Sequence, residues 1–516
     1  MSHRTFCRAL LALAVLAAPL AADEIPADLK REYQDAFRSR DAATRLAVVE
    51  TAAARGDEAG ARLLVEILAR KDSSEERDLF ARRARVQSEI DAIFERAIRD
   101  RRMLTKEEDA GLQGVKANQA AIDREIDALV EVRWRAAEAL TGFDGSAARA
   151  YLIGEALEHE DWFVRWAAAR ALGGEGEPDP VAALIRRLKE DTSPQVITAA
   201  LDALAARKAS VACGDVAGAL SSEHWPVRAA AASCLAALGD LRGVKPLIDR
   251  LEKEDGRLRT DLDLALKALT GFSFDGDHAR WESWWKVHGQ AIELGNFVRG
   301  AGEGAGQQVT GVNFYGVRTL SNRVVFVLDT SGSMKEKAGK PVPVTGDSGR
   351  VVLPEGDTKF DVARAQLKTA LLALPEGAEF NIVFYRQGVS ILSPSMVRVN
   401  RANLDRAFQF IDGHRAAGGT NIFDALHRAL NLVETGDSGA RITRRNYEAL
   451  VDTIFILSDG EPNYGRFKDR EGMIREISRL NGCRKVVIHA IGIGRHDKEF
   501  MKALAGATGG EYAAYE

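Results

Sequence analysis

The stretch RVVFVLDTSGSM, residues 323–334, decides the fold of the second half of this 516-residue chain. Its first part is an unbroken apolar run, which ends at Asp329 in a loop of threonine, serine and glycine. Apolar runs that do not alternate with polar residues are typical of strands buried on both faces, as in parallel sheets that helices cover on either side. The stretch therefore predicts an α/β fold with polar groups at the carboxyl end of a buried strand.

The residues that follow repeat this pattern of short apolar strands and amphipathic helices. The predicted strands are 323–329, 379–385, 451–459, 485–494 and 511–515. The predicted helices are 359–374, 401–413, 422–434, 470–480 and 497–507. In a mostly parallel sheet of this kind, ligands bind outside the carboxyl ends of the strands.

Three loops predicted at that edge carry oxygen-bearing side chains. They contribute Asp329, Ser331, Ser333, Thr420 and Asp459. Because no histidine or cysteine is among them, the set suits a hard cation such as Mg²⁺ better than zinc. Two carboxylates with neutral hydroxyls leave the ion under-neutralised, so an open position can accept a carboxylate from a partner. No positioned general base accompanies them, so the pattern predicts a binding site and not an enzyme.

These motifs closely resemble the von Willebrand factor A domain and its metal-ion-dependent adhesion site, over about residues 322–516. The resemblance implies a doubly wound, Rossmann-like domain that binds Mg²⁺, with Mn²⁺ or Ca²⁺ as alternative ions. It implies that Asp329, Ser331 and Ser333 are first-loop ligands, Thr420 the second-loop hydroxyl and Asp459 the third-loop acid, which often acts through water. One departure is the insertion at 335–358, either a rim that selects the partner or a plain surface loop.

Rival catalytic motifs are weak. The tetrapeptide GDSG occurs at 346–349 and at 436–439, but neither copy has the second glycine or the histidine motif of a serine protease. The sequence has no Gly-x4-Gly-Lys-Ser/Thr phosphate loop, which argues against nucleotide hydrolysis by this chain.

The first half contains a helical repeat. An apolar anchor followed by an alanine-rich helix recurs at spacings of 32, 32, 31 and 31 residues, at Val132, Val164, Val196, Val227 and Leu258. Two helices per unit that cannot bury their apolar stripes alone predict an α-solenoid. The valine-arginine pairs resemble short HEAT repeats, which implies a right-handed stack that binds protein partners; an irregular helical bundle is the alternative.

We expect this solenoid to span residues 23–294. A long helical hairpin at 76–130 interrupts it, with a capping box at Thr105–Glu108 that starts the second helix. Trp281, Trp284 and Trp285 at helical spacing predict a cover for its open end. A glycine-rich, flexible linker is expected at 295–321.

The sequence at the amino terminus predicts where the protein is located. Arg4 and Arg8 precede the apolar run Ala9–Ala18, so residues 1–22 fit a cleaved secretory signal, with an uncleaved membrane anchor as the alternative. A secreted or periplasmic protein with no further transmembrane segment is expected. Cys213 and Cys234 either form a disulfide or are buried thiols.

These features together predict a protein-interaction protein. Its net charge of −4 gives no reason to expect a nucleic-acid partner. The expected partner is a protein that offers an acidic side chain, with the solenoid as a second binding surface. The alternative is a structural scaffold, or an accessory subunit of an ATP-driven assembly machine, whose metal site is stabilising or regulatory. The oligomeric state is not predicted.

Overall fold

The computed structural model describes residues 25–39, 41–70, 74–99, 105–300, 302–303, 312–339, 351–432, 450–482 and 484–515. The predicted signal segment, 1–22, lies outside these residues. Among the residues described, no helix has the length and apolarity needed to cross a membrane. The chain divides into two compact units, and the boundary between them in the sequence lies between Pro180 and Val181.

The first unit is helical. Its α-helices are α1 (Ala27–Arg38), α2 (Ala42–Arg55), α3 (Glu58–Ala69), α4 (Ser74–Arg99), α5 (Lys106–Ala139), α6 (Ser146–Gly154) and α7 (Trp162–Ala171). Two short 3-10 turns, η1 (Leu140–Gly142) and η2 (Ala156–Glu158), connect the last of these. The helix α2 packs against α3, and both pack against α5.

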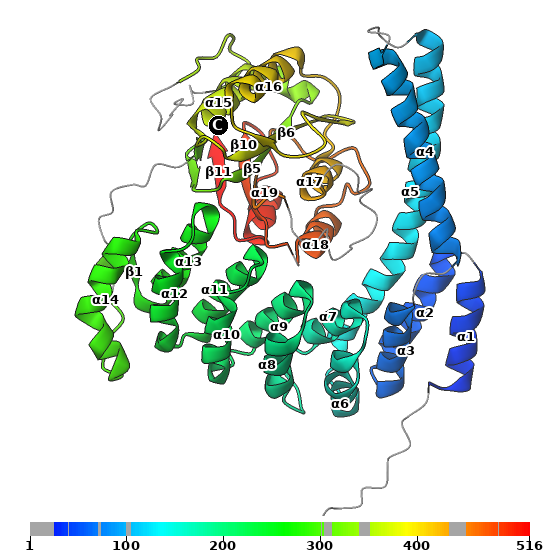
Figure 1. Ribbon diagram of the computed structural model, residues 1–516. Coiled ribbons are helices and arrows are strands. Elements are labelled where there is room, and N and C mark those ends of the chain that lie inside the picture. The colour runs from blue at the N-terminus through cyan, green and yellow to red at the C-terminus, as the bar shows by residue number, and fades with distance from the viewer. Residues whose placement is uncertain are drawn as a thin grey trace, which may run out of the picture. The chain divides into compact units, whose positions relative to one another are not determined.

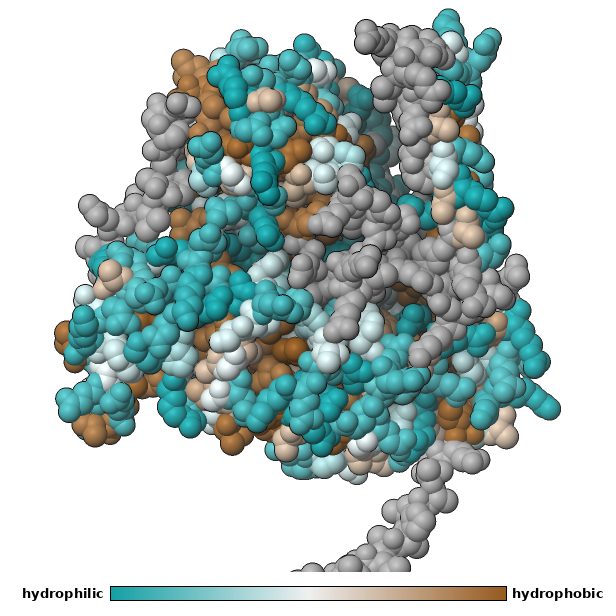
Figure 2. Space-filling model, viewed as in Figure 1, coloured by the Kyte–Doolittle hydropathy of each residue, from teal (hydrophilic) through white to brown (hydrophobic). Residues whose placement is uncertain are grey.

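The predicted helical hairpin is the pair α4 and α5, which lie side by side (Figure 1). Thr105 and Glu108 form the predicted capping box at the start of α5. Val86 and Ile122 are buried, and the surface of the pair visible in Figure 2 is mainly hydrophilic where it is described. The second helix of the hairpin continues past the predicted end at 130 as far as Ala139. No glycine or proline interrupts it between 115 and that residue.

The second unit begins with stacked helix pairs. They comprise α8 (Val181–Glu190), α9 (Pro194–Ala206), α10 (Cys213–Ala219), α11 (Trp225–Leu238), α12 (Val244–Leu251) and α13 (Gly256–Thr270). The pairs α8–α9, α10–α11 and α12–α13 pack internally, and α11 packs against both α9 and α13. The anchors Val196, Val227 and Leu258 are buried, as stacking requires. Cys213 and Cys234 are buried, unpaired thiols.

Helix α14 (His278–Glu293) packs against α12 and carries the tryptophan cluster. Trp281 is fully buried, and its indole Nε1 donates to Asp263 Oδ1 at 2.6 Å. Trp284 is also buried, with its ring centroid 5.5 Å from that of Trp281. These two side chains pack inward, which accords with their predicted role as a cover.

Among the described residues, seven strands form one sheet in the order β11-β10-β9-β5-β6-β7, with β8 also paired to β6. Their bounds are β5 (Arg323–Asp329), β6 (Glu379–Tyr385), β7 (Val389–Ile391), β8 (Val397–Arg398), β9 (Thr453–Ser458), β10 (Val487–Ile493) and β11 (Tyr512–Tyr515). All the pairs from β11 to β6 are parallel, as predicted. The short strands β7 and β8, which were not predicted, pair antiparallel with β6.

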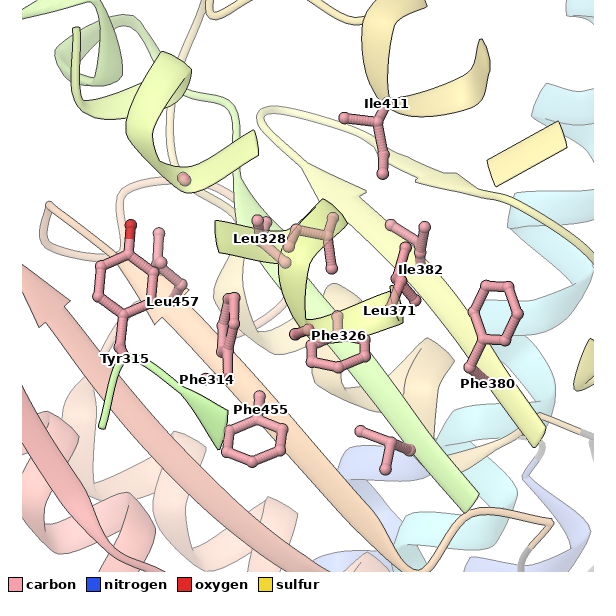
Figure 3. Close-up of a cluster of buried hydrophobic side chains, with 14 of the residues drawn as sticks. Phe314, Tyr315, Phe326, Leu328, Leu371, Phe380, Ile382, Ile411, Phe455 and Leu457 are labelled. Carbon is pink, nitrogen blue, oxygen red and sulfur yellow. The ribbon is translucent and has the colours of Figure 1, made fainter. Parts of the chain in front are cut away.

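Helices cover both faces of this sheet. The helices are α15 (Lys359–Ala373), α16 (Arg401–Gly413), α17 (Ile422–Leu430), α18 (Arg470–Asn481) and α19 (Lys498–Gly506). Alternate residues of β5 point into different cores. Phe326 belongs to the cluster with α15 and α16 (Figure 3), whereas Val325 and Val327 belong to the cluster with α17, α18 and α19. The central strand is therefore buried on both faces, and Asp329 at its end has no exposed surface.

The predicted linker is structured in its last part, so that prediction is wrong for residues 312–319. They form an antiparallel hairpin of β3 (Val312–Phe314) and β4 (Val317–Thr319). Phe314 is fully buried and lies beside Phe326 and Phe455 in the core (Figure 3). Burial of the apolar side chains of Val312, Phe314 and Val317 explains why this segment packs on the sheet.

We expect Phe314→Ala to destabilise the protein by about 3–5 kcal/mol, because it leaves a cavity in a close-packed core. Chemical denaturation followed by the fluorescence or circular dichroism of the α/β domain measures this loss. Val298→Ala is the matched control from the same predicted linker, since Val298 is 83% exposed and its change is expected to be within about 0.5 kcal/mol. Equal stability of the two variants would show that the hairpin is not part of the core.

Candidate metal centre

Two of the three predicted loops leave neighbouring strands at the same edge of the sheet. The central strand β5 ends at Asp329, and β9 ends at Ser458, just before Asp459. The two strands are parallel and in register, with Leu328 opposite Leu457. Their carboxyl ends therefore bring both aspartates to one place, as the strand pattern predicted.

Backbone hydrogen bonds tie the second loop to the first. Gly332 N donates to the Gly418 carbonyl, and Ala417 N donates to the Thr330 carbonyl, each at 2.8 Å. Gly418 has a φ of +83°, and a Cβ there would lie 2.0 Å from Oε1 of Gln387. L side chains rarely adopt this positive φ, so glycine fits the backbone at the point where the second loop approaches the first.

The side chains of the three loops form one hydrogen-bonded cluster. The Oγ atoms of Ser331 and Ser333 lie 3.0 Å apart, and Ser333 Oγ donates to Asp459 Oδ1 at 2.7 Å. A Cβ built on Gly460 would lie 3.5 Å from Thr420 Oγ1 and 3.9 Å from Ser333 Oγ, so both hydroxyls line one small space. Four of the five predicted site residues are buried: Asp329, Ser331, Thr420 and Asp459.

Asp329 is held from two sides. Its Oδ1 accepts a hydrogen bond from Ser331 N at 2.7 Å, and its Oδ2 accepts one from Ser458 Oγ at 3.0 Å. The pKa of this carboxyl is raised to about 7, mainly by burial and also by the nearby charge of Asp459, against the opposing hydrogen bonds from Ser331 and Ser458. A cation placed beside Asp329 would offset this cost of burying a charge.

Three residues with no predicted role complete the cluster. Ser458 holds Asp329, as described above, and Asn463 Oδ1 accepts from Thr420 N at 2.8 Å. The third is Lys359, whose Nζ lies 3.0 Å from Asp459 Oδ2. A sequence signal for Lys359 existed, because it directly follows the capping residue Thr358, and a cation at a helix amino terminus is unfavourable without a partner.

The donor set fits a hard divalent cation. Carboxylate and hydroxyl oxygens converge from three loops, and such ligands suit Mg²⁺, Mn²⁺ or Ca²⁺. Within the described part of the chain, no group of three or more His, Cys, Asp or Glu side chains has the spacing of a metal site. The candidate centre contains only two carboxylates, so any ion held here relies on Ser331, Ser333 and Thr420 for its remaining protein ligands.

Parts of the insertion and both rival motifs lie outside the described residues. The GDSG copies at 346–349 and 436–439 belong to segments that are not described. The two ends of the insertion lie together, since Lys337 and Thr358 form an antiparallel bridge. Its role as a partner-selecting rim or a surface loop stays a prediction.

Comparison with protein families confirms both resemblances. Residues 120–205 and 185–267 match the family model of HEAT repeats, and residues 352–514 match that of the von Willebrand factor type A domain. The chain therefore combines a helical HEAT-repeat region with a C-terminal α/β domain of the von Willebrand factor A type.

Curated relatives match part of this chain. Inter-alpha-trypsin inhibitor heavy chain H4 of Homo sapiens is 31% identical over 155 residues, 30% of this chain and 14% of that protein. Inter-alpha-trypsin inhibitor heavy chain H3 of Rattus norvegicus is 27% identical over 191 residues, 37% of this chain and 18% of that protein. The chain thus spans less than a fifth of the length of either relative.

Among solved structures, the chain is similar to a von Willebrand factor type A protein from Catenulispora acidiphila. The identity is 20%, the match covers 39% of this chain and 40% of that one, and the TM-score is 0.28.

The buried charge of Asp329 predicts a pH-dependent stability in the absence of divalent ions. Because its folded-state pKa is raised from 3.8 to about 7, the folded state favours the protonated carboxyl. Ionisation then costs stability progressively as pH rises from about 4 to about 7, and the cost is constant above that range. In EDTA, Asp329→Asn is therefore expected to be more stable than the wild type at pH 8, by on the order of 1 kcal/mol or more, with the difference shrinking toward pH 5.

Thermal unfolding between pH 5 and pH 8 measures this difference. Asp405→Asn removes an exposed carboxylate on α16 and is expected to show no such pH-dependent gain. If Asp329→Asn were no more stable than the wild type at pH 8, or if its advantage in melting temperature grew as the pH fell, the predicted cost of burying the charge would be contradicted.

Proposed function

We infer that the α/β domain binds a protein partner through a divalent cation held by Asp329, Ser331, Ser333, Thr420 and Asp459. Asp329 and the hydroxyls of Ser331, Ser333 and Thr420 would hold the ion, and Asp459 would support it. When bound, such an ion would supply an electrophilic position suited to a carboxylate of the partner. The chain's own residues would supply the oxygen ligands and orient them by hydrogen bonds within the cluster.

One observation carries this proposal, namely the convergence of the three loops on one space. Hydroxyls of Thr420 and Ser333 line it together beside Gly460, and Ser333 joins it to Asp459. Oxygen-bearing side chains from separate loops that converge on one space are expected of a ligand-binding site.

The arrangement favours binding over a purely stabilising role for the ion. Both carboxylates accept hydrogen bonds from neighbouring residues of the chain, namely Ser331 and Ser458 at Asp329, and Ser333 and Lys359 at Asp459. Because these hydrogen bonds link the loops to one another, we assign the ion a role in recognition. The competing proposal, a scaffold with a stabilising metal site, requires the loops to depend on the ion.

The rest of the proposal rests on the first half of the chain. The HEAT-repeat region offers a second protein-binding surface, as stacked helix pairs commonly do. The secreted or periplasmic location rests on Arg4, Arg8 and the apolar run Ala9–Ala18, which lie outside the described residues. We propose no catalytic residue in either half.

Removing one hydroxyl ligand should weaken ion binding without unfolding the protein. We expect Thr420→Val to lower the affinity for Mg²⁺ or Mn²⁺ about tenfold, which corresponds to about 1.4 kcal/mol, and Asp329→Asn to abolish binding. Isothermal titration calorimetry of the full chain measures both. Thr453→Val is the matched control, because Thr453 is equally buried but lies at the opposite end of β9. Unchanged affinity in Thr420→Val would remove Thr420 from the site.

Partner binding distinguishes adhesion from a structural role. We expect the full chain to capture a protein from cell-envelope extract in Mg²⁺ and to lose it in EDTA or in Asp329→Ala. The melting temperature of that variant measured in EDTA should not fall below that of the wild type in EDTA. A large fall in melting temperature with capture intact would instead support the scaffold proposal.

A further inference from the structure

Lys359 places a buried positive charge against the candidate metal centre. Its side chain is 6% exposed, and its Nζ lies 3.0 Å from Asp459 Oδ2 and 2.7 Å from Glu336 Oε2. Glu336 also accepts the backbone N–H of Lys359 at 2.9 Å through its carbonyl. The ammonium is thus fixed between a carboxylate of the site and one outside it.

The surroundings of Lys359 are shaped for this position. A Cβ on Gly494 would lie 2.9 Å from Lys359 Cε and 3.1 Å from its Nζ, so the side chain lies directly across this glycine. Lys359 is also the first residue of α15, where the helix dipole and burial both disfavour a cation. Such a placement is stable only because Asp459 and Glu336 compensate it.

We propose that Lys359 is a built-in competitor for the divalent cation, which keeps the affinity of the site moderate and its occupancy reversible. This inference rests on the proposed function, because it concerns the same site. It adds a residue that no metal-ligand pattern includes, since an ammonium cannot coordinate a cation.

The charges at the site carry the argument. With both carboxylates ionised, Asp329 and Asp459 contribute two negative charges within the site, and the ammonium of Lys359 offsets one of them. Glu336, which is 68% exposed, lies outside the site. Like charges a few ångströms apart repel, and the repulsion is stronger at a buried site than in water. The ammonium therefore weakens divalent binding by a factor of about ten or more.

The hydrogen bonds show how the competition proceeds. Both oxygens of Asp459 are engaged, Oδ1 by Ser333 and Oδ2 by Lys359. An ion that draws on Asp459 must compete with the ammonium for that carboxylate. Glu336, whose side chain is 68% exposed, remains as a second partner for the ammonium when the first is shared.

The experiment compares charge removal with charge conservation in the full chain. Lys359→Met removes the ammonium and keeps most of the side-chain length, whereas Lys359→Arg keeps the charge. Lys368→Met is the matched control, because Lys368 lies on the same helix and pairs with Asp412 away from the site. Calorimetric titration with Mg²⁺ and Mn²⁺ measures affinity, and melting temperature is measured in EDTA and at saturating Mg²⁺.

We expect Lys359→Met to bind the ion at least tenfold more tightly than the wild type, with Lys359→Arg and Lys368→Met within about twofold of it. In EDTA, Lys359→Met should melt at a lower temperature, because Asp459 loses its partner, and saturating Mg²⁺ should restore it. Glu336→Gln should bind the ion severalfold more weakly, since it leaves the ammonium wholly to Asp459.

Two results would overturn the inference. One is unchanged or weaker ion affinity in Lys359→Met, and the other is an equal loss of melting temperature with and without Mg²⁺, which indicates a structural role alone. Failure of the proposed function is distinguishable from either, because the wild type would then show no Mg²⁺ or Mn²⁺ binding at all.

Discussion

A carboxylate buried at the end of a central strand is the constraint on which the site depends. Asp329 closes β5, which is covered on both faces, and its side chain has no contact with solvent. A buried charge must be hydrogen-bonded or neutralised. Ser331, from the same loop, and Ser458, at the end of the neighbouring strand, both donate hydrogen bonds to the Asp329 carboxylate. The hydrogen bonds of this one residue therefore connect the first loop to the strand end from which the third loop begins.

The locked loops determine the rest of the local structure. With the first loop fixed, Gly332 can bind the Gly418 carbonyl and bring in the second loop with Thr420. The sheet beneath is rigid, because β5 contributes alternate residues to two separate cores. Small loops on a rigid base can hold several oxygens in a constant arrangement, which is what selective ion binding requires.

Neutral hydroxyls make this arrangement possible. Three carboxylates in so small a space would repel one another and raise their own pKa values, whereas serine and threonine add oxygens without charge. The protein introduces its compensating charge separately, through Lys359, so the number of ligands and the net charge are set by different residues. A site built in this way can be adjusted in affinity without changing its coordinating atoms.

Much of this could be predicted from the sequence, because the relevant signals are local. Unbroken apolar runs predicted β5, β6, β9, β10 and β11, and the residues directly after β5 and β9 predicted the site. The repeat spacing predicted the helix pairs, and the family comparison confirmed their type.

The missed features depend on contacts distant in sequence or on very short elements. Lys359 meets Asp459 across 100 residues, and nothing near Lys359 in the sequence indicates that partner. The strands β7 and β8 are too short to show a period, since edge pairing with β6 alone creates them. The hairpin around Phe314 was hidden by the glycine-rich residues before it, whose composition is that of a linker.

That hairpin gives the domain a mechanical property. Tyr315 lies at its tip, where its carbonyl accepts the hydroxyl of Tyr515 from the edge strand β11 and the two rings are 5.0 Å apart. A tensile force on the chain before Val312 must therefore separate β3 from β4 and extract Phe314 before it reaches β5. The hairpin therefore has to open before tension that arrives through the preceding segment reaches the central strand and the proposed ion-binding edge of the sheet.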